Sequence, residues 1–168
     1  SAGLCGISRP QHFRGYATMA LKMLLIVGPD VAFYGHKDAQ RAAVVQKLVK
    51  DLGFTVEINV GPTIRDKDGL AVNALNSRFT RSQRQDARAV YKSLEMAQSM
   101  VENGVRNVDR VLAEVTHMIS RHRRLRVIYV AIVDKDTMEP LREITPGRAL
   151  IAVAVWVDEI RLTDNILV

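Results

Sequence analysis

Residues 29–38 read P-D-V-A-F-Y-G-H-K-D, and this stretch decides the fold. Residues 31–34 are predicted to form a short buried strand, Gly35 makes a turn, and Lys37 and Asp38 stand at the start of a helix. A helix N-terminus that follows a strand and a glycine can bind phosphate, because free backbone N–H groups and the helix dipole face the anion. The alternative is an ordinary strand–helix turn with a solvated lysine and an aspartate cap. The local pattern leaves both interpretations open.

The neighbouring segments predict a parallel α/β sheet. Residues 16–27 and 38–52 have apolar residues at helical spacing, and residues 54–60 alternate with the period of a strand. The order helix–strand–helix–strand is typical of a doubly wound sheet, which binds ligands at the carboxyl ends of its strands. Two strands are too few for a stable sheet. We therefore expect half of such a domain, with an unpaired strand edge and an exposed apolar face.

The remainder of the chain predicts a different architecture. Residues 1–15 and 63–80 are expected to be irregular, and the second of these segments is rich in charged residues. Two helices and three antiparallel strands are then expected, and a domain boundary near residue 80 separates residues 1–80 from residues 81–168. The helices are predicted at residues 81–103 and Val108–Ser120, and the strands at residues 125–133, 148–157 and 161–163.

The composition fits a folded domain. The 168 residues are 48% apolar and 25% charged, which supports a packed core. Cys5 is the only cysteine, which excludes an internal disulfide framework and fits a reducing compartment. No apolar run approaches the length of a membrane span and no signal peptide is visible, so a cytoplasmic protein without a membrane partner is expected. The first residue is Ser1 and not Met, which is compatible with processing or with a piece of a longer chain.

The chain is basic, with a formal net charge of +6 and an isoelectric point of about 9.8. The densest cluster, residues 121–126 (R-H-R-R-L-R), falls at the end of a predicted helix, where cations complement the helix dipole. No aromatic residue is interleaved with it, as a surface for single-stranded nucleic acid would prefer. A solvated helix end is therefore favoured over a nucleic-acid patch, and no nucleic-acid partner is predicted.

Four blocks together resemble pantothenate synthetase, the pantoate–β-alanine ligase family. They are S-R-P-Q-H-F-R-G-Y-A-T (8–18), P-D-V-A-F-Y-G-H-K-D (29–38), P-T-I-R-D-K-D-G-L-A (62–71), and the closing R-A-L-I-A-V-A-V with R-L-T-D-N-I. The resemblance implies a Rossmann-like domain of the nucleotidylyl-transferase type followed by a small α+β lid domain. It also implies an ATP-dependent, AMP-forming ligase that uses Mg²⁺ and works as a homodimer. In this family pantoate attacks the α-phosphate of ATP, and β-alanine then displaces AMP from pantoyl adenylate.

The resemblance assigns roles to residues of three blocks. Gly35 and Asp38 would hold the ATP ribose, and Lys37 would lie against the phosphates as the catalytic cation. Ile64 and Val72 would contact the adenine. Fixed cations and backbone donors stabilise the charge that develops on the α-phosphate. The substrate side would be formed by Arg9, His12, Gln40 and Arg41.

The chain departs from the family pattern at four places. The H-x-G-H signature is absent, and His36 replaces a carboxylate in the family's G-E-K-D. Residues 73–76 read N-A-L-N where the family has S-S-R-N, so two hydroxyls and a phosphate-binding arginine are lost. Arg41 replaces a glutamine that hydrogen-bonds pantoate, although an arginine can also pair with a carboxylate. The phosphate contacts that remain as candidates are Asn73, Ser77 and Arg78.

Simpler interpretations stay beside these. Residues 65–68 would then be a solvated charge run, His36 a surface residue, and Asp158, Glu159 and Asp164 surface or turn residues, so that no protein metal site is predicted. The leading functional hypothesis is the C-terminal part of a pantoate–β-alanine ligase, whose missing half is a separate or cleaved chain, or which is truncated and weakly active or inactive. A homodimer, or a partner chain that supplies the missing half, is expected. One alternative is a non-catalytic binding or dimerisation module derived from that fold. The other is a basic nucleic-acid-binding domain.

Overall fold

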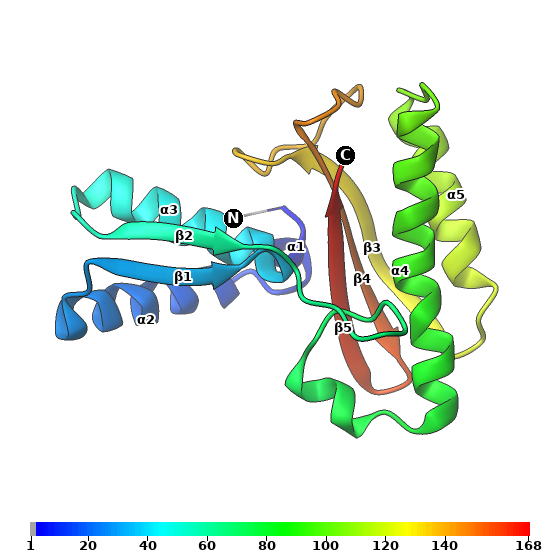
Figure 1. Cartoon of the computed structure of the whole chain (residues 1–168), viewed down its shortest axis with the longest axis horizontal. Coiled ribbons are helices and arrows are strands. Elements are labelled where there is room, and N and C mark those ends of the chain that lie inside the picture. The colour runs from blue at the N-terminus through cyan, green and yellow to red at the C-terminus, as the bar shows by residue number, and fades with distance from the viewer. Residues whose placement is uncertain (1–2) are drawn as a thin grey trace. The chain divides into compact units, whose positions relative to one another are not determined.

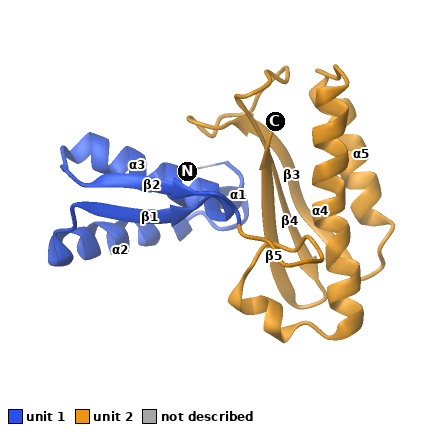
Figure 2. Cartoon of the chain, in the orientation of Figure 1, with its two compact units in different colours: residues 1–63 blue, residues 64–168 orange. Residues whose placement is uncertain are grey.

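The computed structural model describes residues 3–168, and the chain divides into two compact units (Figure 2). The first unit comprises residues 1–63 and the second Ile64–Val168. Each unit is described by itself.

The first unit is a two-stranded parallel sheet with helices (Figure 1). Strands β1 and β2 pair in register from Val31 opposite Glu57 to Gly35 opposite Gly61. This parallel pair, with α3 as its crossover, confirms the predicted strand–helix–strand unit. The elements are α1 (Cys5–Ser8), α2 (His12–Val27), β1 (Val31–Gly35), the 3₁₀ turn η1 (His36–Asp38), α3 (Ala39–Leu52) and β2 (Glu57–Gly61).

Helices α2 and α3 cover one face of this sheet. Leu24, Val45 and Val56 form the buried centre of the unit, and Val45 is completely inaccessible to solvent. The opposite face carries Val31 and Phe33, and the Phe33 side chain is 80% exposed. The expected uncovered apolar face of a half-sheet is therefore present.

Two details of the first unit differ from the sequence expectations. Residues 1–15 were expected to be irregular, but α1 and the first turn of α2 lie there, and Gly15 is inside a helix. Gly15 weakens the helical pattern locally, but the packing of Phe13, which is buried, holds this turn in place. Strand β2 begins later than predicted, because Phe54 leaves the strand and packs on the helical core.

The second unit is a three-stranded antiparallel sheet in the order β3-β4-β5, with two helices on one face (Figure 1). The central strand β4 is almost entirely buried, since it has a strand on each side and helices above it. The last strand continues well past the predicted residues 161–163. The elements are the 3₁₀ turn η2 (Ala74–Arg78), α4 (Arg81–Glu102), α5 (Val108–Ser120), β3 (Leu125–Asp134), β4 (Ala149–Val157) and β5 (Ile160–Leu167).

Helix α4 provides much of the core of this unit. Thr80 begins it with a capping box, in which the Thr80 hydroxyl accepts from the Gln83 N–H and the Gln83 side chain accepts from the Thr80 N–H. The predicted apolar stripe faces the sheet, and all of its members are buried. They are Ala87, Val90, Leu94, Ala97 and Val101.

The boundary between the units lies earlier in the chain than the predicted boundary near residue 80. Residues 64–80 fall in the second unit, because a few of their side chains anchor the segment there. Leu70 is buried in the core beneath α4, and Arg65 pairs with Asp164 of β5. The fold class itself, a parallel α/β half-sheet followed by a small α+β unit with antiparallel strands, is confirmed.

Within residues 3–168, no helix combines the length and the hydropathy that a membrane span requires.

Candidate nucleotide and substrate site

The carboxyl ends of the two parallel strands form a glycine pair, Gly35 beside Gly61. A Cβ atom placed on Gly35 would have no heavy atom within 4 Å, and one on Gly61 would only reach the Tyr34 carbonyl oxygen at 3.9 Å. Within the described residues there is room for a side chain at both positions, so packing does not explain why they are glycines. Because glycine has no side chain, the backbone at these two positions is open, and a ligand that binds at this end of a parallel sheet needs such close approach.

Asp38 is held between two cations directly after this glycine pair. Lys37 Nζ lies 3.4 Å from Asp38 Oδ1, and Arg41 Nη1 lies 3.2 Å from Asp38 Oδ2. The Lys37 side chain is only 15% exposed, so its ammonium group is restrained beside the start of α3. Asp38 precedes α3 as its N-terminal residue, but its side chain makes no capping hydrogen bond. The carboxylate instead orients two positive charges.

An open groove of about 660 Å³ lies along the start of α2. The His12 ring stacks on Tyr16 with centroids 6.5 Å apart, and the Arg41 guanidinium lies 5.4 Å from the centre of the same tyrosine ring. Burial raises the pKa of Tyr16, with Tyr34 and Asp38 adding to the effect and Arg41 opposing it. Two residues predicted for the substrate side, Arg9 and His12, thus line one groove. Its lining is Arg9, Pro10, Gln11, His12, Gly15, Tyr16 and Met19.

Gln40 has a structural position. Its Oε1 accepts from the Cys5 N–H at 3.1 Å, and its Nε2 donates to the Gly3 carbonyl oxygen at 2.8 Å. Gln40 therefore ties the loop before α2 to α3. Its side-chain amide groups are used within the chain, and its predicted substrate contact stays a prediction.

Ile64 and Val72 lie in the second unit, at the two ends of a tight hairpin. The Val72 N–H donates to the Ile64 carbonyl oxygen at 2.9 Å, and both side chains are exposed. Gly35, Lys37 and Asp38 thus come together in one unit, and the two predicted adenine contacts come together in the other.

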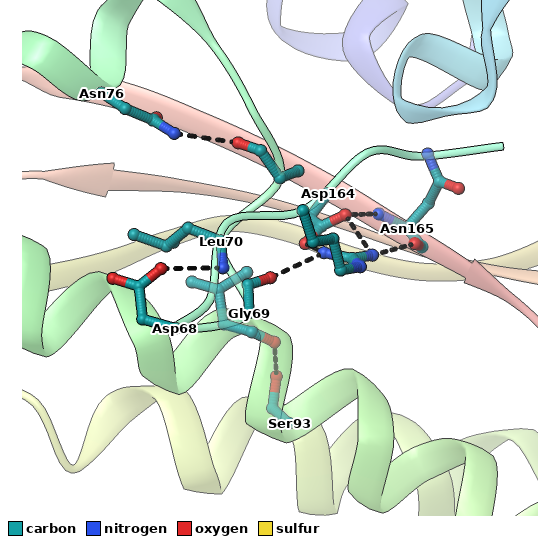
Figure 3. Close-up of polar contacts among 10 residues, drawn as sticks. Asp68, Gly69, Leu70, Asn76, Ser93, Asp164 and Asn165 are labelled. Carbon is teal, nitrogen blue, oxygen red and sulfur yellow. Dashed lines mark hydrogen bonds and ion pairs between the residues drawn. The ribbon is translucent and has the colours of Figure 1, made fainter.

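The charged run in this hairpin is only partly solvated, which corrects the alternative interpretation of residues 65–68 at its two ends: Arg65 and Asp68 are half-buried and paired, whereas Asp66 and Lys67 are exposed. The Arg65 guanidinium binds both carboxylate oxygens of Asp164, at 2.6 and 3.0 Å. Figure 3 shows Asp164 and Asn165 of β5 beside Gly69 and Asp68 of the hairpin. Asp164 is 3% exposed, so the expectation that it is a surface or turn residue is wrong. An ion pair between residues far apart in sequence leaves no local pattern, which is why the sequence did not reveal it.

The turn η2 carries the N-A-L-N segment. Asn73 caps this turn by accepting from the Leu75 N–H at 3.0 Å, and Asn76 donates to the Ala71 carbonyl oxygen at 2.9 Å (Figure 3). The Ser77 hydroxyl donates to the Ala74 carbonyl oxygen, within its own turn. Arg78 is exposed and makes no ion pair with any residue that the structure describes. Of the predicted phosphate contacts, Arg78 is the one whose side chain is open to solvent and not committed elsewhere.

The basic cluster after α5 is partly neutralised. Arg124 binds Asp86 at 3.0 Å and lies 3.9 Å from Asp158, and His122 lies 3.3 Å from Asp86. Burial alone would raise the pKa of Asp86, but hydrogen bonds from Arg124 and His122 outweigh it and lower this pKa. The cluster therefore joins α4 to the turns around it.

Comparison with known proteins gives the family. The model of the pantoate-beta-alanine ligase family matches residues 1–167. The chain belongs to the pantoate–β-alanine ligase family. Pantothenate synthetases from Caldicellulosiruptor saccharolyticus and Moorella thermoacetica are 41% and 42% identical to it over 165 and 164 residues, which is 98% of this chain and 58% of each relative.

Solved structures agree with this family assignment. The crystal structure of pantothenate synthetase from Thermus thermophilus superimposes with a TM-score of 0.93 at 35% identity, over 99% of this chain and 59% of that protein. A pantoate-beta-alanine ligase from Francisella tularensis, solved in complex with β,γ-ATP and β-alanine, gives a TM-score of 0.72 at 25% identity, over 99% of this chain and 54% of that protein. This ligase-family chain therefore spans less than two thirds of the length of the relatives that it matches.

Among residues 3–168, no group of three or more His, Cys, Asp or Glu side chains is arranged to hold a metal ion. The phosphate contacts of Lys37 and Arg78 stay predictions, and both side chains are cationic.

Proposed function

We propose that this chain forms part of a pantoate–β-alanine ligase of pantothenate biosynthesis. In the proposed reaction the carboxylate of pantoate attacks the α-phosphate of ATP, giving pantoyl adenylate and pyrophosphate. The amine of β-alanine then attacks the acyl carbon and displaces AMP. The observation that carries this proposal is the corner formed by Gly35, Lys37 and Asp38, which combines open backbone with a restrained cation at the carboxyl end of a parallel strand.

Lys37 is the proposed catalytic residue. The attack on the α-phosphate adds negative charge to its non-bridging oxygens, and a cation already fixed beside them stabilises that charge without reorganisation. Asp38 holds the Lys37 ammonium at 3.4 Å, which limits the positions that it samples. Loss of one such electrostatic contact costs a factor of about 10² to 10³ in rate. Asp38, with one oxygen toward Lys37 and the other toward Arg41, would also accept a ribose hydroxyl.

The substrate side would be built around Arg41 and the groove on α2. Arg41 stands where the family pattern has a glutamine, and a guanidinium binds a carboxylate more strongly than an amide does. Its guanidinium already lies over Tyr16, whose ring also faces His12. Arg9 lines the same groove and adds a second positive charge. This arrangement suits an anionic substrate such as pantoate.

Mg²⁺ is proposed to arrive with ATP. The described residues offer no carboxylate cluster for it. Mg²⁺ is commonly held by substrate phosphates and water with few protein ligands. The protein would then supply Lys37 and backbone donors around a phosphate-bound ion.

A complete ligase site is proposed to need more than this chain contributes. The chain lacks the H-x-G-H signature, and its relatives are longer. The sheet face that carries Val31 and Phe33 is uncovered and apolar, which suits packing against the remainder of a doubly wound domain. The missing part would come from a partner chain or from the rest of a longer protein, in a cytoplasmic homodimer.

The test is AMP formation from ATP, pantoate and β-alanine with Mg²⁺. The chain would be assayed alone and mixed with the first-half segment of a relative. We expect slow turnover alone, because several phosphate contacts are missing, and a large increase on mixing. Lys37→Ala should lower the mixed activity by about 10² to 10³, while Lys47→Ala, which changes an exposed lysine paired with Asp51 on the same helix, should leave it unchanged. Fast turnover by the chain alone would refute the need for the other half, and no AMP under any condition would refute the ligase.

One observation favours a second candidate, a non-catalytic binding module. Leu75 stands where the family has a phosphate-binding arginine, and Asn73 uses its side-chain oxygen to cap η2. Calorimetry with ATP and with a pantoyl-adenylate analogue separates the two candidates. Binding of neither ligand, with or without the complementing segment, would favour the non-catalytic module.

A further inference from the structure

The hairpin formed by residues 64–72 presents two apolar side chains at its open end. The Ile64 and Val72 side chains are 68% and 50% exposed, and the hydrogen bond between their backbones keeps them adjacent. A second backbone bond, from the Asp66 N–H to the Leu70 carbonyl oxygen at 2.8 Å, continues the ladder toward the turn. The result is a small apolar shelf on a polar hairpin, and Leu70 anchors the hairpin in the core of the second unit.

Arg65 fastens this hairpin from its inner side. Neighbouring residues of an extended strand point to opposite faces, so Arg65 points into the unit where Ile64 points out. Besides its two bonds to Asp164, the Arg65 guanidinium donates to the Gly69 carbonyl oxygen at 3.1 Å and to the Asn165 carbonyl oxygen at 3.3 Å. It also lies 3.9 Å from the centre of the Tyr91 ring. One side chain therefore links both arms of the hairpin to β5 and α4.

Arg84 fastens the tip of the hairpin from α4. Its Nε and Nη2 atoms bind the Asp68 carboxylate at 2.7 and 3.0 Å, and Nη2 also lies 2.7 Å from Asp66 Oδ2. The Arg84 hydrogen bonds lower the pKa of Asp68, which favours the ionised carboxylate in this contact. Both sides of the hairpin tip are thus fixed to one helix.

This network exceeds what anchoring the chain requires. Leu70 is already 1% exposed in the core, and a buried ion pair contributes little net stability compared with apolar residues of similar size. The Arg65 guanidinium instead holds the whole hairpin in a single geometry. A planar group that donates to four acceptor oxygens and stacks on the Tyr91 ring can do so in only one arrangement. The shelf of Ile64 and Val72 is fixed as a consequence.

We propose that Arg65 and Asp164 are positioning residues for nucleotide binding, which hold residues 64–72 rigid so that Ile64 and Val72 meet a purine base without further ordering. This inference rests on the proposed function, which makes ATP the ligand. Ordering a loop at the moment of binding weakens affinity, and a loop ordered during folding avoids that cost. Neither Arg65 nor Asp164 needs to touch ATP.

The experiment compares Arg65→Met and Arg65→Lys with the matched control Arg148→Met. Arg148 also pairs with a buried aspartate in the second unit, Asp134 at 2.7 Å, but it holds a different loop. The first readout is amide hydrogen exchange of the peptide that covers residues 64–72. The second is the dissociation constant for MgATP from calorimetry, and the third is the KM for pantoate in the complemented assay.

We expect both Arg65 variants to speed exchange in the hairpin and to weaken MgATP binding by about tenfold or more, with the KM for pantoate unchanged. Lysine should not rescue, because it keeps the charge but lacks the fork. Arg148→Met should leave all three readouts at wild-type values even if it lowers the unfolding temperature as much. Faster exchange without weaker MgATP binding, or unchanged exchange, would overturn the inference. If the wild-type chain does not bind MgATP even when the complementing segment is present, the proposed function fails, and the exchange data still decide separately whether Arg65 rigidifies the hairpin.

Discussion

Replacing Gly69 by alanine should destabilise the second unit through two separable effects. Gly69 has a φ of +88°, a left-handed conformation that costs an alanine about 1–2 kcal/mol. In addition, a Cβ atom at this position would lie 2.3 Å from Cδ1 of the Tyr91 ring. Side chains do not tolerate such a distance, so the ring or the hairpin must move.

The Tyr91 ring is not free to yield, because the Arg65 guanidinium is stacked on it at 3.9 Å. Forcing an extra methyl group into such a packed place costs about 1–3 kcal/mol. We therefore expect Gly69→Ala to lower the free energy of unfolding by about 2–5 kcal/mol in total. With a urea m-value of about 2 kcal/mol/M, the midpoint should fall by about 1 to 2.5 M.

The assay is urea unfolding followed by the fluorescence of Trp156, the only tryptophan, which lies in the second unit. Gly104→Ala and Gly147→Ala are matched controls. These glycines have φ values of +90° and +79° but no heavy atom within 4 Å of an added Cβ, so they report the backbone cost alone. In a Tyr91→Ala background, Gly69→Ala should cost no more than these controls. Equal midpoints for all three alanine variants in the wild-type background would refute the reasoning.

Three further predictions follow from separate sites. The pKa of Asp134 is lowered to about 2, mainly by hydrogen bonds from the backbone N–H groups of Thr137 and Asp136. The contribution of the ionised Asp134 to stability is therefore present above about pH 4 and is lost as the pH falls toward 2. Asp134→Asn should make the free energy of unfolding less dependent on pH between these values, as measured by urea unfolding at each pH. Phe33→Ser should change the stability of the first unit by less than about 0.5 kcal/mol, since the side chain is exposed, but should reduce self-association in sedimentation velocity. Asn73→Ser combined with Leu75→Arg should strengthen MgATP binding in calorimetry, because serine also caps a helical turn and the new arginine is exposed beside it.

Each of these has a contrary outcome. If the acid limb is unchanged in Asp134→Asn, protonation of Asp134 does not contribute to the loss of stability at acid pH. Self-association that persists in Phe33→Ser would place the self-associating surface elsewhere, with Leu52→Ser, an exposed apolar residue at the end of α3, as the comparison. If the double variant at Asn73 and Leu75 binds MgATP no better than Asn73→Ser alone, η2 does not approach the phosphates.

The sequence predicted the elements whose signals are local. Alternation along β2, the spacing along α3 and α5, and the glycines that end α2 and α3 are properties of neighbouring residues, and the structure has these elements within a few positions. The start of α2 was missed because Gly15 and Pro10 act against a helix locally, whereas the burial of Phe13 acts through tertiary packing. The charge pattern of residues 65–68 could not distinguish a solvated loop from an ion-paired one.

The candidate site follows the same rule: its local contacts could be predicted from the sequence, and its tertiary contacts could not. Lys37 and Asp38 are neighbours in sequence, and their ion pair is local. The sequence does not identify Tyr16 as a site residue, because its position between His12 and Arg41 depends on how α2 packs on α3. The sequence predicts Asp164 at the surface for the same reason, since only the folded sheet brings it to Arg65.

The bond between Arg65 and Asp164 joins residues that are 99 positions apart, and this has a consequence during synthesis. A ribosome adds roughly 5–20 residues per second, so Asp164 is added about 5–20 s after Arg65. During that interval Arg65 has no buried acceptor, and the segment around it is open to proteases and chaperones. In a nascent chain that stalls before β5, the hairpin therefore lacks its ion pair with Asp164, whereas in a finished chain the hairpin is held by it.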